Sequence, residues 1–179
     1  MTSTLRTLAA TSAAALLLAL AACTATPSPE PTPTQATAGA GECAGVTVVV
    51  DASALELEDG DPSQETCIQT DDAIAASDAL DQADVTTEGT VDYGDQVVCR
   101  VNGVPAEDVA LPQPDGSDYF EACEGMPAAF AYWSLWVQPE GGEWEYAQEG
   151  LSTLQLQPGE SLALLFSLNG DPGAPSSIS

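Results

Sequence analysis

The chain carries apolar runs of strand length that are separated by turn residues. One valine-rich run spans residues 45–51 (GVTVVVD), and further runs span 96–101 (QVVCRV), 130–137 (FAYWSLWV) and 161–168 (SLALLFSL). β-Branched and aromatic residues are favoured in strands, where they pack on a pleated surface. Each of the four runs therefore predicts a β-strand.

Shorter segments predict additional strands and two turns. The additional strands are expected at 54–58 (ALELE), 85–91, 144–147 (WEYA) and 154–156. The sequence Pro-Glu-Gly-Gly at 139–142 predicts a hairpin between two of the aromatic segments. Asn102-Gly103 predicts a tight turn, because both residues tolerate a positive φ.

One segment has helical spacing instead, and it predicts a helix over about 70–83. Thr70 is the expected N-cap, and Asp71 and Asp72 suit the positive end of a helix dipole. The apolar residues that recur on one face are Ala73, Ala76, Leu80 and Ala83. Strands, one helix and then more strands predict an α+β domain with a mainly antiparallel sheet.

The N-terminal residues predict export and a lipid anchor. A charge-free apolar run follows Arg6 and ends at Leu20-Ala21-Ala22-Cys23. A basic start, an apolar centre and small residues before the cleavage point are typical of a signal peptide. The cysteine there resembles the bacterial site at which a diacylglycerol is attached. At about 15 residues the run is shorter than the roughly 20 that span a bilayer. We expect a signal peptide at 1–22 and lipidated Cys23 on the extracytoplasmic face of the membrane.

The rest of the chain divides into three parts by composition. Residues 23–41 contain the lipidated cysteine and a Pro- and Thr-rich linker, which predicts an extended spacer. Residues 42–168 have the length of a single domain with a sizeable core. The tail at 169–179 (NGDPGAPSSIS) is expected to be disordered.

The charge balance is strongly acidic. The chain has 28 Asp and Glu residues, only two Lys and Arg residues, and a net charge of −26. Nucleic acid is therefore not an expected partner, because binding of its phosphates needs clustered lysine and arginine side chains. Solubility of an exported protein is the ordinary explanation for so many acids. Attraction to a cationic partner or to a divalent metal is the functional alternative.

Four cysteines follow Cys23, and their even number in an exported chain predicts disulfides. They are Cys43, Cys67, Cys99 and Cys123. Of the three possible connectivities we predict the pairing of sequence neighbours, Cys43–Cys67 and Cys99–Cys123. The close Cys-x-x-Cys spacing of structural zinc sites is missing, so no metal site is predicted from these cysteines.

No catalytic motif is found. The chain contains neither histidine nor lysine, so the usual bases that activate a serine or cysteine nucleophile are missing. We predict no catalytic residues, no enzyme activity and no cofactor, with a carbohydrate-active enzyme as the least favoured reading. Residues Asp59–Glu65 are similar to half of a calcium loop. Counted from Asp59, the sixth position of the loop is Gln64 instead of the required glycine, and the twelfth is Thr70 instead of glutamate. An acidic turn is therefore favoured.

An aromatic block is the main candidate for a binding surface. Its candidate ligand-binding residues are Trp133, Trp136, Trp144 and Tyr146. On a strand Trp133 and Trp136 face opposite sides, so one fills the core and the other lies on the outer face or under a loop. A structural role in the core and hairpin is the ordinary explanation. An exposed aromatic ledge for a neutral or cationic ligand is the alternative.

Several segments together resemble a known family. They are 93–105 (YGDQVVCRVNGVP), 131–136 (AYWSLW), 142–146 (GEWEY) and 157–160 (QPGE). They are similar to small exported proteins of high-GC Gram-positive bacteria, which in turn resemble the carboxy-terminal, cobalamin-capping domain of transcobalamin and intrinsic factor. The resemblance covers about residues 46–166. It implies a small α+β domain, and it supports the pairing of Cys99 with Cys123.

The resemblance also implies a function. Proteins of this kind are often encoded beside energy-coupling-factor vitamin transporters, which implies capture of a vitamin-like, corrinoid ligand. We therefore expect a membrane-anchored surface lipoprotein whose binding domain is accessory to uptake of such a ligand. The alternative is an envelope adaptor that binds another protein.

Overall fold

The computed structural model describes residues 43–57, 60–170 and 173–175. The predicted signal peptide, Cys23 and the linker lie outside the described residues, as does most of the predicted tail. Within the described part, Asn169 is tied down, since its N–H donates to the Phe130 carbonyl and its side-chain amide to the Pro112 carbonyl. No helix among the described residues is long and apolar enough to cross a membrane.

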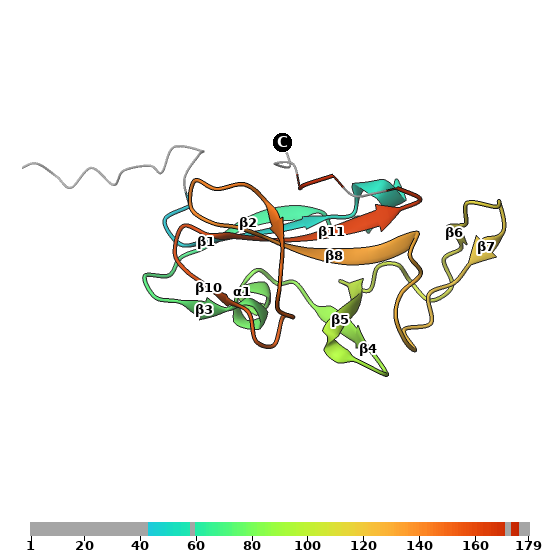
Figure 1. Ribbon diagram of the computed structural model, residues 1–179, viewed down its shortest axis with the longest axis horizontal. Helices are drawn as coiled ribbons and strands as arrows, with labels where there is room; N and C mark the ends of the chain where they lie inside the picture. The colour runs from blue at the N-terminus through green and yellow to red at the C-terminus, as the bar shows by residue number, and fades with distance from the viewer. Residues whose placement is uncertain (1–42, 58–59, 171–172, 176–179) are drawn as a thin grey trace, which may run out of the picture. The chain divides into compact units, whose positions relative to one another are not determined.

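A five-stranded sheet forms the centre of the domain (Figure 1). Its strands, in spatial order, are β2 (Gln64–Ile68), β1 (Val46–Asp51), β11 (Ser161–Leu168), β8 (Ala131–Gln138) and β9 (Glu145–Tyr146). All neighbours are antiparallel except β1 and β11, which run parallel. The expected α+β class with mostly antiparallel pairing is confirmed, and the central sheet is mixed.

The parallel pair lies in the middle of the sheet because its residues are apolar on both faces. Even-numbered side chains of β1 and β11 point into the main core, and these are Val46, Val48, Val50, Leu162, Leu164 and Phe166. Odd-numbered Val49 and Ala163 are buried in a smaller cluster on the other face. Continuous apolar runs are typical of strands covered on both sides.

The predicted helix is shorter than expected. Helix α1 spans Ala76–Gln82, not 70–83, and Thr70 is not its N-cap. Instead, the Thr70 hydroxyl accepts a hydrogen bond from the N–H of Asp72. The two residues before the helix form β3 (Ile74–Ala75), which pairs with β10 (Gln155–Leu156). This long-range pairing holds residues 74–75 in an extended conformation and so delays the start of the helix.

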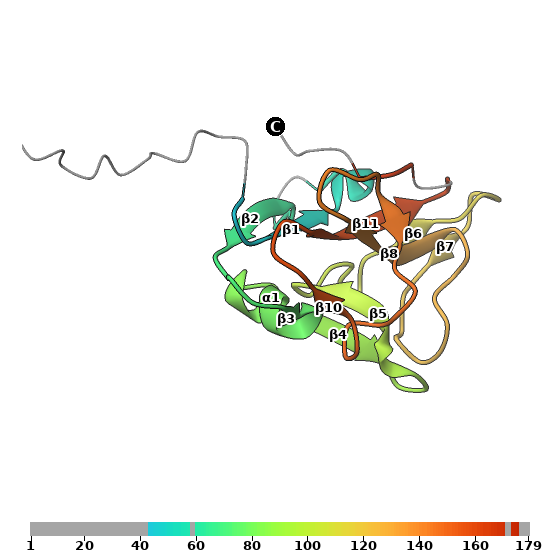
Figure 2. The ribbon, with the colours of Figure 1, turned by 60° about the vertical axis from the view of Figure 1, so that its left-hand side comes forward.

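A second layer covers one face of the sheet (Figure 2). It consists of α1, the β3–β10 pair, and the antiparallel ribbon of β4 (Thr87–Thr90) and β5 (Gly94–Val101). Helix α1 contributes Ala76, Ala79 and Leu80 to the main core, and β5 contributes Val98 and Val101.

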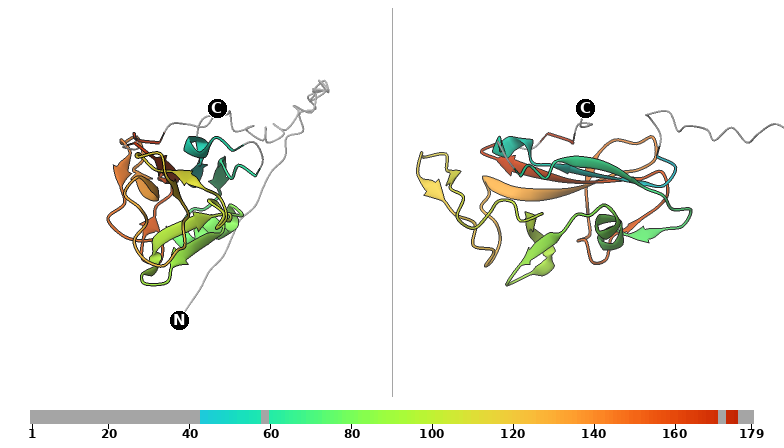
Figure 3. Two further views of the ribbon diagram at one scale, coloured as in Figure 1. Left: turned by 90° about the vertical axis from the view of Figure 1, so that its right-hand side faces the viewer. Right: turned by 180° about the vertical axis from the view of Figure 1, so that it is seen from behind.

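Three local elements complete the fold. The predicted strand at 54–58 is wrong where it is described, because Ser53–Leu55 form a short 3-10 helix, η1, that ends at Glu56 with a φ of 48°. Strands β6 (Leu111–Pro112) and β7 (Asp118–Tyr119) pair with each other and project beyond one end of the sheet (Figure 3). The predicted turn at Asn102-Gly103 is present, with positive φ at both residues.

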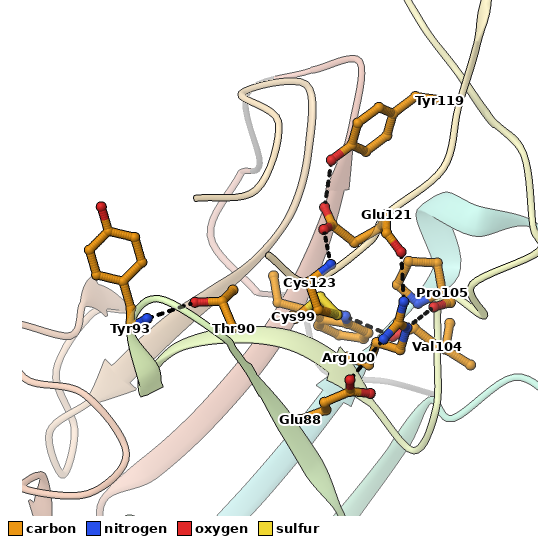
Figure 4. Close-up of a disulfide and its surroundings, with 11 residues drawn as sticks. Glu88, Thr90, Tyr93, Cys99, Arg100, Val104, Pro105, Tyr119, Glu121 and Cys123 are labelled. Atoms are coloured by element: carbon orange, nitrogen blue, oxygen red, sulfur yellow. Dashed lines mark hydrogen bonds and ion pairs between the residues drawn. A yellow bond between two sulfur atoms is a disulfide. The ribbon is translucent and has the colours of Figure 1, made fainter. Parts of the chain in front are cut away.

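Arg100 on β5 joins three segments of the loop-rich half of the domain (Figure 4). Its guanidinium is buried and donates to the carbonyl oxygens of Pro105 at 2.8 Å and Glu121 at 2.6 Å. A third hydrogen bond, of 2.9 Å, goes to the carboxylate of Glu88 on β4. Because the Glu88 side chain is 56% exposed, the two carbonyl contacts are the better shielded part of this network.

We expect Arg100→Met to lower the free energy of unfolding by about 3–5 kcal/mol, because it leaves two buried carbonyl groups and Glu88 without their donor. Glu88→Gln is the matched control and should cost no more than about 1 kcal/mol. Urea unfolding followed by tryptophan fluorescence measures both. Equal losses for the two variants would show that the surface ion pair, and not the carbonyl contacts, dominates.

Candidate ligand-binding site

Both predicted disulfides are present. Cys43 pairs with Cys67 and Cys99 pairs with Cys123. The first joins the start of the described chain to edge strand β2. The second joins β5 to the loop before β8, next to the Arg100 network (Figure 4).

The surroundings of Cys99–Cys123 contain a buried carboxylate. Glu121 accepts hydrogen bonds from the Tyr119 hydroxyl at 2.8 Å and from the Cys123 N–H at 2.7 Å. Burial, and then the hydrogen bond and charge of Glu121, raise the pKa of Tyr119 to about 12. The two sulfur atoms beside Glu121 are bonded to each other, so they are not free thiolates for a metal. This cluster therefore supports the loop rather than forming a metal centre.

The acidic segment before β2 forms a local turn where it is described. The Asp61 carboxylate accepts a hydrogen bond from the Ser63 N–H at 2.8 Å, and Gln64 and Glu65 already belong to β2. Asp59 lies outside the described residues.

Trp133 and Trp136 lie on opposite faces of the sheet, as their spacing predicts. Trp133 belongs to the main core and is 7% exposed. Its ring meets that of Phe166 edge to face at 5.2 Å, and its indole N–H donates to the Val104 carbonyl at 3.0 Å. Trp133 thereby joins the sheet to the turn that follows β5.

Trp136 is also buried, at 6% exposure, but on the other face. It packs against Val49 and Ala163, and the partly buried Trp144 packs against the same cluster. The ring of Tyr146 stacks on Trp136 at a centroid distance of 3.9 Å. Since Tyr146 is 46% exposed, its ring covers Trp136 and presents the outer aromatic surface.

A cavity of about 400 Å³ lies beside the buried Trp133. It is bounded by β5 at 95–98, by β8 at 132–135, and by residues 146–151, which include the last residue of β9 and the segment after it. Trp133, Tyr146 and Tyr132 are among the residues that line it, and the ring of Tyr146 itself stacks on Trp136 on the other face of the sheet. Trp136 and Trp144 are not among the described residues that line it.

The cavity exists because the chain leaves the sheet early. Strand β9 ends at Tyr146, and the segment after Ala147 turns toward β5 instead of continuing along β8. A Cβ placed at Gly150 would lie 3.2 Å from the Cα of Gln96. The close approach at Gly150 therefore leaves little room for a side chain there. The sequence pattern named Trp133 and Tyr146 as candidate binding residues but predicted a ledge and gave no indication of the β5 side, since strand periodicity carries no information about which strands face each other.

A second cavity, of about 440 Å³, adjoins the first. The two share Asp95 and Leu151 in their linings, and the second is bounded by α1 and the start of β4. Carboxylates line both, with Glu149 in the first, Asp81 in the second and Asp95 in each. Arg100, the only base after Arg6, lines neither of them. This electrostatic environment favours a neutral or cationic ligand over an anion.

Comparisons with known proteins returned no match to a family model, a curated protein or a solved structure.

We expect Trp133→Ala and Trp136→Ala each to lower the free energy of unfolding by about 3–5 kcal/mol, because each removes a buried ring from a packed cluster. Trp144→Ala, at a half-buried position, should cost less. Urea unfolding followed by circular dichroism compares the three. A loss below about 1 kcal/mol for either of the first two variants would mean that its ring is a surface ledge and not core.

Proposed function

We propose that this protein is a lipid-anchored binding protein on the extracytoplasmic face of a bacterial membrane, and that the cavity beside Trp133 holds its ligand. The observation that carries the proposal is that Tyr132, Trp133 and Tyr146 all line one cavity. A concave site lined by apolar and aromatic residues together with some polar groups is the usual form of a small-molecule site. Its volume of about 400 Å³ lies within the range of about 300–1,000 Å³ for such sites.

The ligand that we propose is small and vitamin-like. The acids around the cavity favour a neutral or cationic molecule, and the resemblance of the aromatic segments to cobalamin-capping domains favours a corrinoid. Since the cavity is near the small end of the range, it would enclose an edge of such a macrocycle rather than the whole. The absence of histidine and lysine from the chain supports binding without catalysis.

A second candidate function, that of an envelope adaptor, is favoured by a separate surface. Val91 is 82% exposed, Met126 is 66% exposed and Tyr93 is 45% exposed. The β4–β5 turn that carries Val91 is joined to the loop of Met126, because the Val91 N–H donates to the Cys123 carbonyl at 2.8 Å. We call Val91, Tyr93 and Met126 the apolar tip. Exposed apolar side chains gathered in this way are typical of protein contacts.

The ligand proposal predicts that Tyr146→Ala weakens corrinoid binding. Isothermal titration calorimetry of the full-length protein with cyanocobalamin should give saturable binding, with affinity lowered about tenfold or more by Tyr146→Ala, because Tyr146 is among the residues that line the cavity and tyrosines are frequent hot spots of binding. Tyr93→Ala is the matched control, since the two tyrosines are 46% and 45% exposed and Tyr93 lies outside the cavity lining.

The same pair of variants separates the two functions. The adaptor function predicts that cyanocobalamin produces no heat of binding in the calorimeter. It also predicts that an envelope protein can be cross-linked to the parent protein in cells and that Tyr93→Ala abolishes this cross-link. These two results together would replace the corrinoid-binding function by the adaptor function. Equal corrinoid affinity of the parent and Tyr146→Ala would move the ligand away from this cavity.

The lipid anchor has a separate test. Cys23→Ser removes the expected acylated side chain, so the variant should move from the membrane fraction of cells to the soluble or secreted fraction. Two or more acyl chains are needed for stable attachment. Retention of the Cys23→Ser protein in the membrane would contradict lipidation at this residue.

A further inference from the structure

The edge of β8 that faces β9 is paired along only part of its length. The Ala147 N–H donates to the Leu135 carbonyl at 2.9 Å, and the pairs beyond it are Trp136 with Tyr146 and Val137 with Glu145. Main-chain groups of an antiparallel strand point alternately to its two neighbours. The N–H and C=O groups of odd-numbered residues of β8 therefore face β9, and those of even-numbered residues face β11.

Trp133 is the next odd-numbered position, and the ladder does not reach it. Its N–H and C=O point to the β9 side, where the chain has already turned away, and no described residue forms a hydrogen bond with either group. Farther along, the Ala131 N–H is used by the Ala128 carbonyl at 3.0 Å. The unpaired position at Trp133 opens into the cavity, since residues 132–135 line it.

An open donor and acceptor on one residue of a strand edge match one residue of an extended peptide, which would exchange two hydrogen bonds with Trp133. The side chain of a residue paired in this way points to the same face as that of Trp133. That face is covered by β5 and the 147–151 segment, so the incoming side chain would approach Asp95 and Glu149.

The charges around the gap indicate which peptide fits. Asp95 and Glu149 line the cavity, and the guanidinium of Arg100 is held by Glu88 and two main-chain carbonyls. A second copy of this chain is a poor partner, because the chain has 28 acids and only two bases. A partner must supply the positive charge itself.

We propose that the gap beside Trp133 binds an extended peptide segment with a lysine or arginine side chain, which adds a short strand to the edge of β8. The inference rests on the proposed binding role of the cavity, but not on a corrinoid being its ligand. Main-chain hydrogen bonds to Trp133 would hold the segment, and the two carboxylates would select its basic side chain.

The open edge is tested first without a ligand. In the full-length protein, NMR hydrogen exchange should be at least about tenfold faster at the Trp133 N–H than at the Ser134 N–H, which faces β11. Slow exchange at Trp133 would mean that the edge is already covered, by another part of the chain or by its neighbours, and would overturn the proposal.

Binding is tested with N-acetyl-Ala-Lys-Ala-amide and the same peptide methylated on the lysine main-chain nitrogen. The first should slow exchange at Trp133. The methylated peptide should bind on the order of tenfold more weakly, because it lacks the N–H that would donate a hydrogen bond to the Trp133 carbonyl. The protein is unchanged in this comparison, so misfolding cannot produce the difference.

The charge selection is tested by the double variant Asp95→Asn, Glu149→Gln. This variant should lose the preference for N-acetyl-Ala-Lys-Ala-amide over the same peptide with glutamate in place of lysine. The control is the double variant Asp78→Asn, Asp84→Asn, which changes the charge equally but away from the cavity lining and should keep the preference. Equal binding of the methylated peptide, or an unchanged preference in the cavity variant, would overturn the proposal. Corrinoid binding without peptide binding would overturn this inference alone, and binding of neither ligand would also remove the proposed role of the cavity.

Discussion

The loop-rich half of the domain depends on one buried guanidinium. Arg100 donates to Pro105, Glu121 and Glu88, which lie on three different segments. A lysine could not take its place fully, because the planar guanidinium directs its five donors in fixed directions. In a chain with so many acids, the single base of the domain is thus used inside the fold and not on its surface.

The cavity follows from how this half is attached to the sheet. The Arg100 network holds the turn after β5, and the Trp133 indole binds the Val104 carbonyl in that same turn. The disulfide Cys99–Cys123 ties β5 to the loop before β8. These contacts fix β5 beneath β8 near Trp133, while the early end of β9 leaves the space between them unfilled.

The aromatic block therefore has two roles that its composition does not separate. Trp136 and Trp144 belong to the packing of the outer face, where Tyr146 covers Trp136. Trp133 fills the core with its ring, yet its main-chain groups face the cavity. A buried side chain and an open strand edge can thus occur at the same residue, since side chains and main-chain hydrogen bonds point in perpendicular directions from a strand.

Local sequence was sufficient for elements whose pattern is self-contained. The run at 161–168 is β11 with the same bounds, and the run at 130–137 matches β8 to within one residue at each end. The Asn102-Gly103 turn and the opposite faces of Trp133 and Trp136 also followed from spacing and residue type. The predicted disulfide pairing is confirmed, but spacing alone left three connectivities open. Tertiary structure decided the rest. Pairing with β10 shortened the predicted helix, and the chain's path placed β1 parallel to β11 in the middle of the sheet, where both faces are covered. The cavity required β5 and β8, about 35 positions apart in the sequence, to face each other, and periodicity within a strand specifies its two faces but not its neighbours in space.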